Sequence, residues 1–207
     1  MKHSIVLLSS ILVASSALAN PAAPAARGDA AKAQPIVTGV CGGCHGVDGN
    51  SLVPNFPKLA GLPLEYINKQ LNDYKSGVRK NPTMAPMAST LSAEDMLNVA
   101  AYFSSQTPTP GTAKDPALVA AGQKVYKGGN MGSGLPACAS CHGPKGAGIP
   151  AQFPRLAGQH SDYTLIQLRD FRTGERANDG AKMMQTIAKK MTEQEMKAVA
   201  EYVAGLR

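Results

Sequence analysis

The apolar residues of this chain recur at helical spacing, and no stretch shows the strict alternation of a β-strand. Helices are expected to begin after Ser92 and after Thr192, because an acidic residue follows each hydroxyl three positions later. With Glu195 in that position, the second is a full capping box. Further helices are predicted over residues 66–74, 115–127 and 163–171. The stretch before residue 41 contains Pro35, so its helix is expected to be short or kinked. The predicted fold class is all-α.

An internal repeat runs through the chain at an offset of 97 residues. It includes a Phe-Pro-Lys/Arg-Leu-Ala-Gly segment at residues 56–61 and 153–158. Four further positions match at the same offset: Tyr66, Gln70, Leu71 and Gly77 correspond to Tyr163, Gln167, Leu168 and Gly174. The offset then becomes 100, so the second copy carries three extra residues after Gly174. We predict two homologous domains, 20–107 and 117–207, joined by a linker over residues 108–116 that is rich in Pro and Gly.

The first 19 residues have the pattern of a secretory signal peptide. Lys2 supplies a positive start, residues 5–13 are apolar, and residues 17–19 form a small-residue cleavage site. A membrane anchor is the alternative, but the apolar run is too short to span a bilayer. We therefore predict export to the periplasm, with residues 1–19 removed.

Four cysteines occur as two pairs, and in an oxidising compartment two disulfides would be the ordinary interpretation. Each pair, however, belongs to a C-x-x-C-H motif. The motifs are Cys41-Gly42-Gly43-Cys44-His45 and Cys138-Ala139-Ser140-Cys141-His142. Two thiols at this spacing can form thioethers with the two vinyl groups of one haem, and the following His then becomes the proximal iron ligand. A lone C-x-x-C can also bind zinc or exchange disulfides. Two copies ending in His predict two covalently bound haem c groups.

Methionine is the candidate for the sixth iron ligand, because the repeats share no second His: His160 aligns with Pro63 and is interpreted as a surface or haem-edge residue. The candidates form two pairs, Met84 with Met87 and Met183 with Met184. Met84 and Met184 each lie eight residues before the capping hydroxyl of the following helix, which favours them. Met87 stays open as an alternative, since it matches Met184 at the offset of 97.

A thioether opposite an imidazole raises the reduction potential of a haem, and a filled sixth position leaves no vacancy for substrate. Both properties predict electron transfer rather than catalysis. Three other methionines are interpreted as core residues: Met96, Met191 and Met196.

Composition and charge add two points. Aromatic residues make up only 5% of the chain, with no Trp, so a bound macrocycle would help to fill the core. Residues 20–113 carry 7 basic and 6 acidic side chains, whereas residues 114–207 carry 13 and 8. The second domain is therefore expected to attract an acidic partner surface, unless its charge serves solubility alone. Nucleic-acid binding is not expected, because the chain is exported and has no basic-aromatic patch.

The mature chain as a whole resembles the cytochrome c4 family, which is built from two class I cytochrome c domains. The resemblance is carried by the paired C-x-x-C-H motifs, the twin segments 56–61 and 153–158, residues 176–180 and the two Met-containing loops. It implies two tandem domains, each wrapped around one haem, with Met84 and Met184 as axial ligands. It also implies that Pro57 and Pro154, each twelve residues after a haem His, offer their carbonyls to that imidazole.

The same resemblance implies a soluble carrier that passes electrons from a quinol-oxidising cytochrome complex to a haem-copper terminal oxidase, with room for peripheral docking at the membrane. An electron-transfer subunit of a larger enzyme, such as a flavocytochrome-type sulfide dehydrogenase, is the alternative. A di-haem peroxidase would need one haem with an open sixth position, whereas both domains offer a Met. A zinc-binding module is not expected in an exported chain whose two C-x-x-C motifs both end in His.

Overall fold

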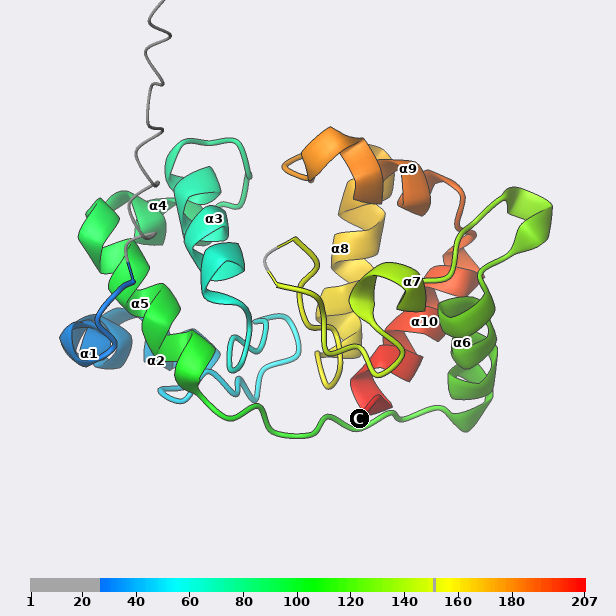
Figure 1. Ribbon diagram of the computed structural model, residues 1–207, viewed down its shortest axis with the longest axis horizontal. Coiled ribbons are helices and arrows are strands. Elements are labelled where there is room, and N and C mark those ends of the chain that lie inside the picture. Colours follow the sequence, from blue (N-terminus) through cyan, green and yellow to red (C-terminus); the bar gives the residue numbers. More distant parts are fainter. Residues whose placement is uncertain (1–26, 151) are drawn as a thin grey trace, which may run out of the picture.

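The computed structural model describes residues 27–150 and 152–207, so the predicted signal peptide lies outside the described residues. Two bundles of helices stand side by side, α1–α5 in the first half of the chain and α6–α10 in the second (Figure 1). Within the described residues the chain forms no named β-strand, only the isolated bridges Asn130–Leu135 and Ile149–Phe153. The all-α prediction is confirmed.

The main helices of the first half have counterparts in the second, whereas the short 3-10 and π segments differ between the halves. The first half consists of η1 (Ala31–Ala33), α1 (Gln34–Ile36), η2 (Val37–Cys41), α2 (Gly42–His45), α3 (Leu64–Lys75), α4 (Met84–Ser89) and α5 (Ala93–Ser105). The second half consists of α6 (Pro116–Gly128), η3 (Met131–Ser133), α7 (Ala139–His142), α8 (Ser161–Thr173), η4 (Gly180–Lys182), α9 (Met183–Lys189) and α10 (Glu193–Gly205). The short helices α4 and α9, which contain the candidate methionines, were not among the helices predicted from the sequence.

The last helix of each half begins with a capping box. Thr192 caps α10, and its backbone N–H donates to the Glu195 carboxylate over 2.8 Å. Ser92 caps α5 in the same reciprocal way, with its N–H donating to Asp95 over 2.9 Å. The shorter Asp therefore closes the box as completely as Glu does. Each cap satisfies amides that a helix start leaves unpaired and stabilises the fold by about 1 kcal/mol.

Proline shapes the two N-terminal helices differently. Pro35 lies in a run that stays helical from residue 31 to residue 45 but changes from 3-10 (η1) to α (α1) to π geometry (η2), so its regular α segment is short, as predicted. In α6, Pro116 occupies the first helical position, where proline costs nothing, and Asp115 caps the amide of Ala117 over 2.9 Å. The result is one unbroken helix of 13 residues.

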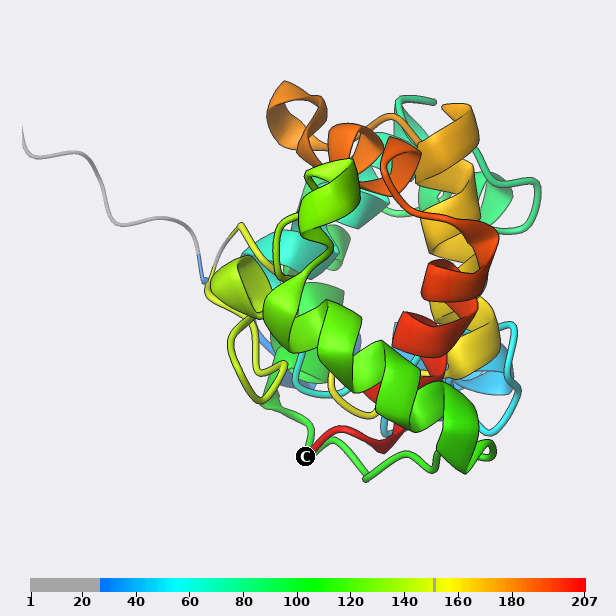
Figure 2. The same cartoon turned by 90° about the vertical axis from the view of Figure 1, so that its right-hand side faces the viewer.

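Each half has its own hydrophobic core. In the first, α3 packs against α5; in the second, α10 packs against both α6 and α8. Figure 2 looks at the second half, with α6 beside α10. Met96, Met191 and Met196 are buried, as expected for core methionines. Between the halves, residues 106–115 form no helix, and the N–H of Asp115 donates to the buried carboxylate of Glu201 in α10 over 2.9 Å.

None of the helices in the described part of the chain has the length and apolar character needed to cross a membrane.

The crossing of α6 and α10 depends on the absence of a side chain at Gly122. A Cβ at this position would lie 2.0 Å from the carbonyl oxygen of Ala198. We predict that Gly122→Ala forces the helices apart and lowers the free energy of unfolding by roughly 1–3 kcal/mol, measured by guanidinium unfolding of the haem-loaded protein. Gly128→Ala, at the end of the same helix with nothing within 4 Å of its Cβ, is the matched control and should not destabilise. Equal losses in both variants would contradict this account of the crossing.

Candidate haem-binding sites

The C-x-x-C-H motifs form α2 in the first domain and α7 in the second, one short helical turn each. That turn places the two cysteines of a motif on one side and the His after them on the inside. All four cysteines are free and half-buried, so the structure contains no disulfide between them. Burial raises the pKa of the Cys41 and Cys138 thiols to about 11, which keeps these side chains protonated and uncharged.

The motif histidines, His45 and His142, are buried with the same geometry. In each, Nδ1 donates to a proline carbonyl over 2.9 Å, that of Pro57 for His45 and that of Pro154 for His142. Burial lowers the pKa of both imidazoles, although the bond to the carbonyl opposes this effect. Each ring is therefore neutral, with its proton on Nδ1 and the lone pair of Nε2 free. This is the form in which histidine binds a metal ion.

The two favoured methionines are half-buried and pack against the apolar cores of their domains. Met84 packs against the first apolar core together with Cys41, and Met184 against the second together with Cys138. Met87 is 43% exposed and Met183 41% exposed. The structure thus packs one methionine of each pair against the apolar core of its domain and leaves the other more exposed, which supports the ligand choice made from the sequence.

Each Met-containing helix is anchored at its start by a polar side chain. The N–H of Met84 donates to Asn81 Oδ1 over 2.9 Å, and the N–H of Gln185 donates to Asp179 Oδ2 over 3.0 Å. The second domain accommodates its three extra residues here, in η4, where Ala181 and Lys182 both adopt left-handed backbone angles, with φ of 51° and 55°. Asp179 consequently takes the capping role that Asn81 has in the first domain.

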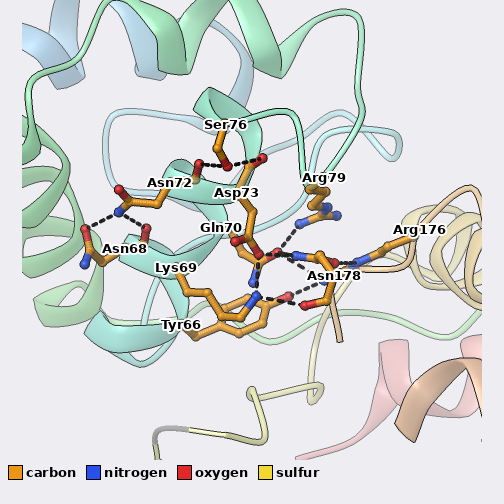
Figure 3. A network of polar contacts seen from close by, with 10 residues as sticks. All are labelled: Tyr66, Asn68, Lys69, Gln70, Asn72, Asp73, Ser76, Arg79, Arg176 and Asn178. Carbon is orange, nitrogen blue, oxygen red and sulfur yellow. Dashed lines mark hydrogen bonds and ion pairs between the residues drawn. The ribbon is translucent and has the colours of Figure 1, made fainter. Parts of the chain in front are cut away.

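Helices α3 and α8 face each other across the domain contact, where two arginines form a nearly symmetric network. Figure 3 shows the first-domain side of this network together with Arg176 and Asn178. Arg79 donates to Gln70 of its own domain over 2.8 Å and to the Tyr163 hydroxyl of the other over 3.1 Å. Arg176 donates to Gln167 over 2.8 Å and to the Tyr66 hydroxyl over 3.1 Å. The two arginines are themselves related by the repeat offset of 97, a signal that could have revealed them and that our sequence reasoning did not use.

One residue breaks this symmetry. Asn178 donates to Gln70 over 2.9 Å and to the Asp73 carboxylate over 2.6 Å, both in the other domain. Its repeat counterpart, Asn81, is occupied in capping α4. The three-residue insertion therefore frees Asn178 to strengthen the contact between the domains.

The described residues fit a haem in each domain. Arg79 and Arg176 are buried, and the hydrogen-bond acceptors that they contact are neutral amide and hydroxyl oxygens. Among the described residues Arg155 Nε is a buried donor without a partner. Buried cationic donors call for an anion, and a haem carries two propionate carboxylates. Paired thiols, a neutral imidazole and a half-buried thioether complete the donor set that a covalently attached haem requires.

Because this set of residues occurs once in each domain, the molecule is a c-type cytochrome with two covalently bound haems. A family model described as cytochrome c matches the chain twice, over residues 30–107 and 119–207. The chain is 48% identical over 192 residues to cytochrome c4 of Azotobacter vinelandii, covering 87% of this chain and 90% of that one. It is also 41% identical over 170 residues to the thiosulfate dehydrogenase electron acceptor of Stutzerimonas stutzeri (strain A1501), covering 80% and 78%.

Among solved structures, that of reduced recombinant cytochrome c4 from Pseudomonas stutzeri superimposes with a TM-score of 0.83 at 47% identity, covering 87% of this chain and all of the other. The chain belongs to the cytochrome c4 family. It is an electron-transfer protein rather than an enzyme, and its partners are redox proteins.

Substitution of the methionines tests the choice within each pair. We predict that Met84→Ala lowers the midpoint potential of one haem, because the soft sulfur that stabilises ferrous iron is lost, while the exposed Met87→Ala leaves both potentials unchanged. The same contrast is expected between Met184→Ala and Met183→Ala for the other haem. The measurement is an optical redox titration of each purified variant. A lowered potential in Met87→Ala but not in Met84→Ala would show that the register chosen for the first domain is wrong.

Proposed function

We propose that this protein is a periplasmic carrier that takes electrons from a quinol-oxidising cytochrome complex and delivers them to a haem-copper terminal oxidase. The observation that carries the proposal is that each domain contains one buried neutral imidazole and one half-buried methionine that packs against the apolar core of that domain. With both axial positions filled, neither iron offers a vacancy for substrate. A haem in such a site supplies an iron that alternates between ferric and ferrous states at little structural cost.

In this proposal the two domains extend over residues 20–107 and 117–207, and each residue of the haem sites has a specific role. The cysteines form the thioethers, two per haem: Cys41 and Cys44, then Cys138 and Cys141. His45 and Met84 bind the first iron, and His142 and Met184 bind the second. Pro57 and Pro154 hold the imidazoles in the tautomer that presents Nε2 to the iron, as their 2.9 Å contacts with Nδ1 support.

The contact between the domains supports internal electron transfer. The segment after α3 bonds to α8 through Arg79 and Tyr163, and the segment after α8 bonds to α3 through Arg176 and Tyr66. These bonds make the two haem domains one body through which an electron can enter at one haem and leave at the other.

Charge supports docking of an acidic partner on the second domain. Lys182, Lys189 and Lys190 are exposed on α9 and next to it, close in sequence to Met184. The excess of basic residues from position 114 onward adds to their attraction. The same surface suits peripheral docking at an anionic membrane. The leader-like residues 1–19 support the periplasmic location.

A second role is favoured by one relative. The thiosulfate dehydrogenase electron acceptor is 41% identical to this chain, which supports the alternative of an electron-transfer partner for a sulfur-oxidising enzyme, as in a flavocytochrome-type sulfide dehydrogenase. Stable co-purification with a flavoprotein or another dehydrogenase would favour this role. Rapid oxidation of the isolated protein by membranes that contain the terminal oxidase would favour the carrier.

A redox titration followed by peroxide tests the proposal for the isolated protein. We expect two one-electron steps at positive potentials and no reaction with peroxide, because a thioether occupies the sixth position of each iron. Visible absorption measures both. One step far below the other, with rapid peroxide turnover, would show an open haem and would overturn the proposal that both irons have His and Met ligands.

A further inference from the structure

Gln159 joins the two domains through the backbone of Lys58, the residue that follows Pro57. It lies in the loop before α8, in the second domain, and its side-chain amide pairs with the backbone of Lys58 in the first. Its Oε1 accepts from the Lys58 N–H over 2.9 Å, and its Nε2 donates to the Lys58 carbonyl over 2.9 Å. Because the backbone offers a donor on one side and an acceptor on the other, only one orientation of the Gln159 amide satisfies both.

The Lys58 N–H belongs to the same peptide group as the Pro57 carbonyl, which accepts the Nδ1 proton of His45 over 2.9 Å. Three groups are therefore connected in series: the imidazole donates to the peptide oxygen, and the N–H of that peptide donates to Gln159. Hydrogen bonds in such a chain polarise one another, so a partner on the N–H makes the carbonyl a better acceptor. Gln159 acts in this way on His45 from the other domain.

The second domain does not receive the same contact in return. The repeat offset places Leu62 at the position equivalent to Gln159, and a leucine side chain cannot pair with a peptide group. Within residues 27–150 and 152–207, no side chain pairs with the N–H of Arg155, the residue that follows Pro154. His45 and His142 thus have identical direct partners, but only the partner of His45 is polarised by a side chain across the domain contact.

The orientation of the Gln159 side chain is fixed by a further hydrogen bond within the second domain. Its Oε1 also accepts from the backbone N–H of His160 over 3.0 Å, which fixes the side chain against the start of α8. His160 Nε2 lies 2.9 Å from the carbonyl oxygen of Ser51, a second hydrogen bond to the first domain. His160 is therefore a residue of the domain contact. The equivalent position in the first domain is Pro63, which cannot make this hydrogen bond.

We propose that Gln159 is a positioning residue for the first haem: it strengthens the hydrogen bond between His45 and Pro57 across the domain contact and thereby lowers the reduction potential of that haem relative to the second. A stronger bond at Nδ1 makes the imidazole a more basic ligand, and a more basic ligand stabilises ferric iron. The effect also makes the first potential depend on how the domains are docked. The inference rests on the proposed role of His45 as an iron ligand.

Gln159→Met tests it, because methionine keeps the length and packing of glutamine and loses both hydrogen bonds. In the haem-loaded protein we expect the first haem to become easier to reduce, with a change of roughly two- to threefold in its ferric-to-ferrous ratio at a fixed potential. The second haem should keep its potential. Proton NMR should show weakened hydrogen bonding of the His45 Nδ1 proton and faster exchange of the Lys58 amide.

His160→Ala is the matched control, since it removes the neighbouring hydrogen bond between the domains without touching the Pro57–Lys58 peptide. If loosening of the contact were the cause, both variants would shift the first haem alike; that result, or an unchanged first potential in Gln159→Met, would overturn the inference. The wild-type spectrum separates the two claims. Without a His45 ring signal shifted by the iron, the ligand assignment itself fails; with that signal and no effect of Gln159→Met, only the inference fails.

Discussion

The central constraint in each domain is that the imidazole of His45 or His142 stays neutral, buried and fixed in orientation. A histidine protonated on both nitrogens cannot bind iron. A histidine protonated on Nε2 has no lone pair on the nitrogen that would face the iron. The bond from Nδ1 to a proline carbonyl, 2.9 Å long in both domains, resolves both difficulties at once. Proline suits this role because its restricted φ holds the loop in place and it brings no competing N–H of its own. The rest of each domain holds that loop, the motif helix and the methionine-bearing helix against one apolar core.

The contact between the domains follows a different rule, because it is built from buried positive charge. Arg79 and Arg176 stack over the rings of Tyr74 and Phe171, at 4.7 and 4.5 Å from the ring centres, and their partners from both domains are neutral. Such an arrangement is costly by itself and becomes favourable beside carboxylates, which a haem supplies. If the propionates lie beside these arginines, haem binding would stabilise the domain contact.

Two homologous domains need not be equivalent, and here small changes separate them. Three inserted residues move the cap of the methionine helix from an Asn to Asp179 and release Asn178 to the contact with Asp73. Gln159 occupies the loop position that Leu62 holds in the first domain. Its hydrogen bond to the Lys58 N–H lets the second domain act on the first, and Leu62 cannot make the equivalent hydrogen bond in return. A difference in potential between two haems gives internal electron transfer a preferred direction, and the differences between these two domains lie at their contact.

Local patterns determined much from the sequence alone. The C-x-x-C-H motifs, the capped helices after Ser92 and Thr192 and the irregular helix at Pro35 depend on residues near one another in the chain, so they can be interpreted without coordinates, and the repeat is visible from the sequence itself. The choice of Met84 over Met87 was already favoured by counting, but only packing shows that Met84 lies against the apolar core and that Met87 is exposed. The pairing of Arg79 with Tyr163 and of Gln159 with Lys58 joins residues 84 and 101 positions apart. No local pattern encodes such contacts, because they form only when two finished domains meet, and tertiary structure alone decided them.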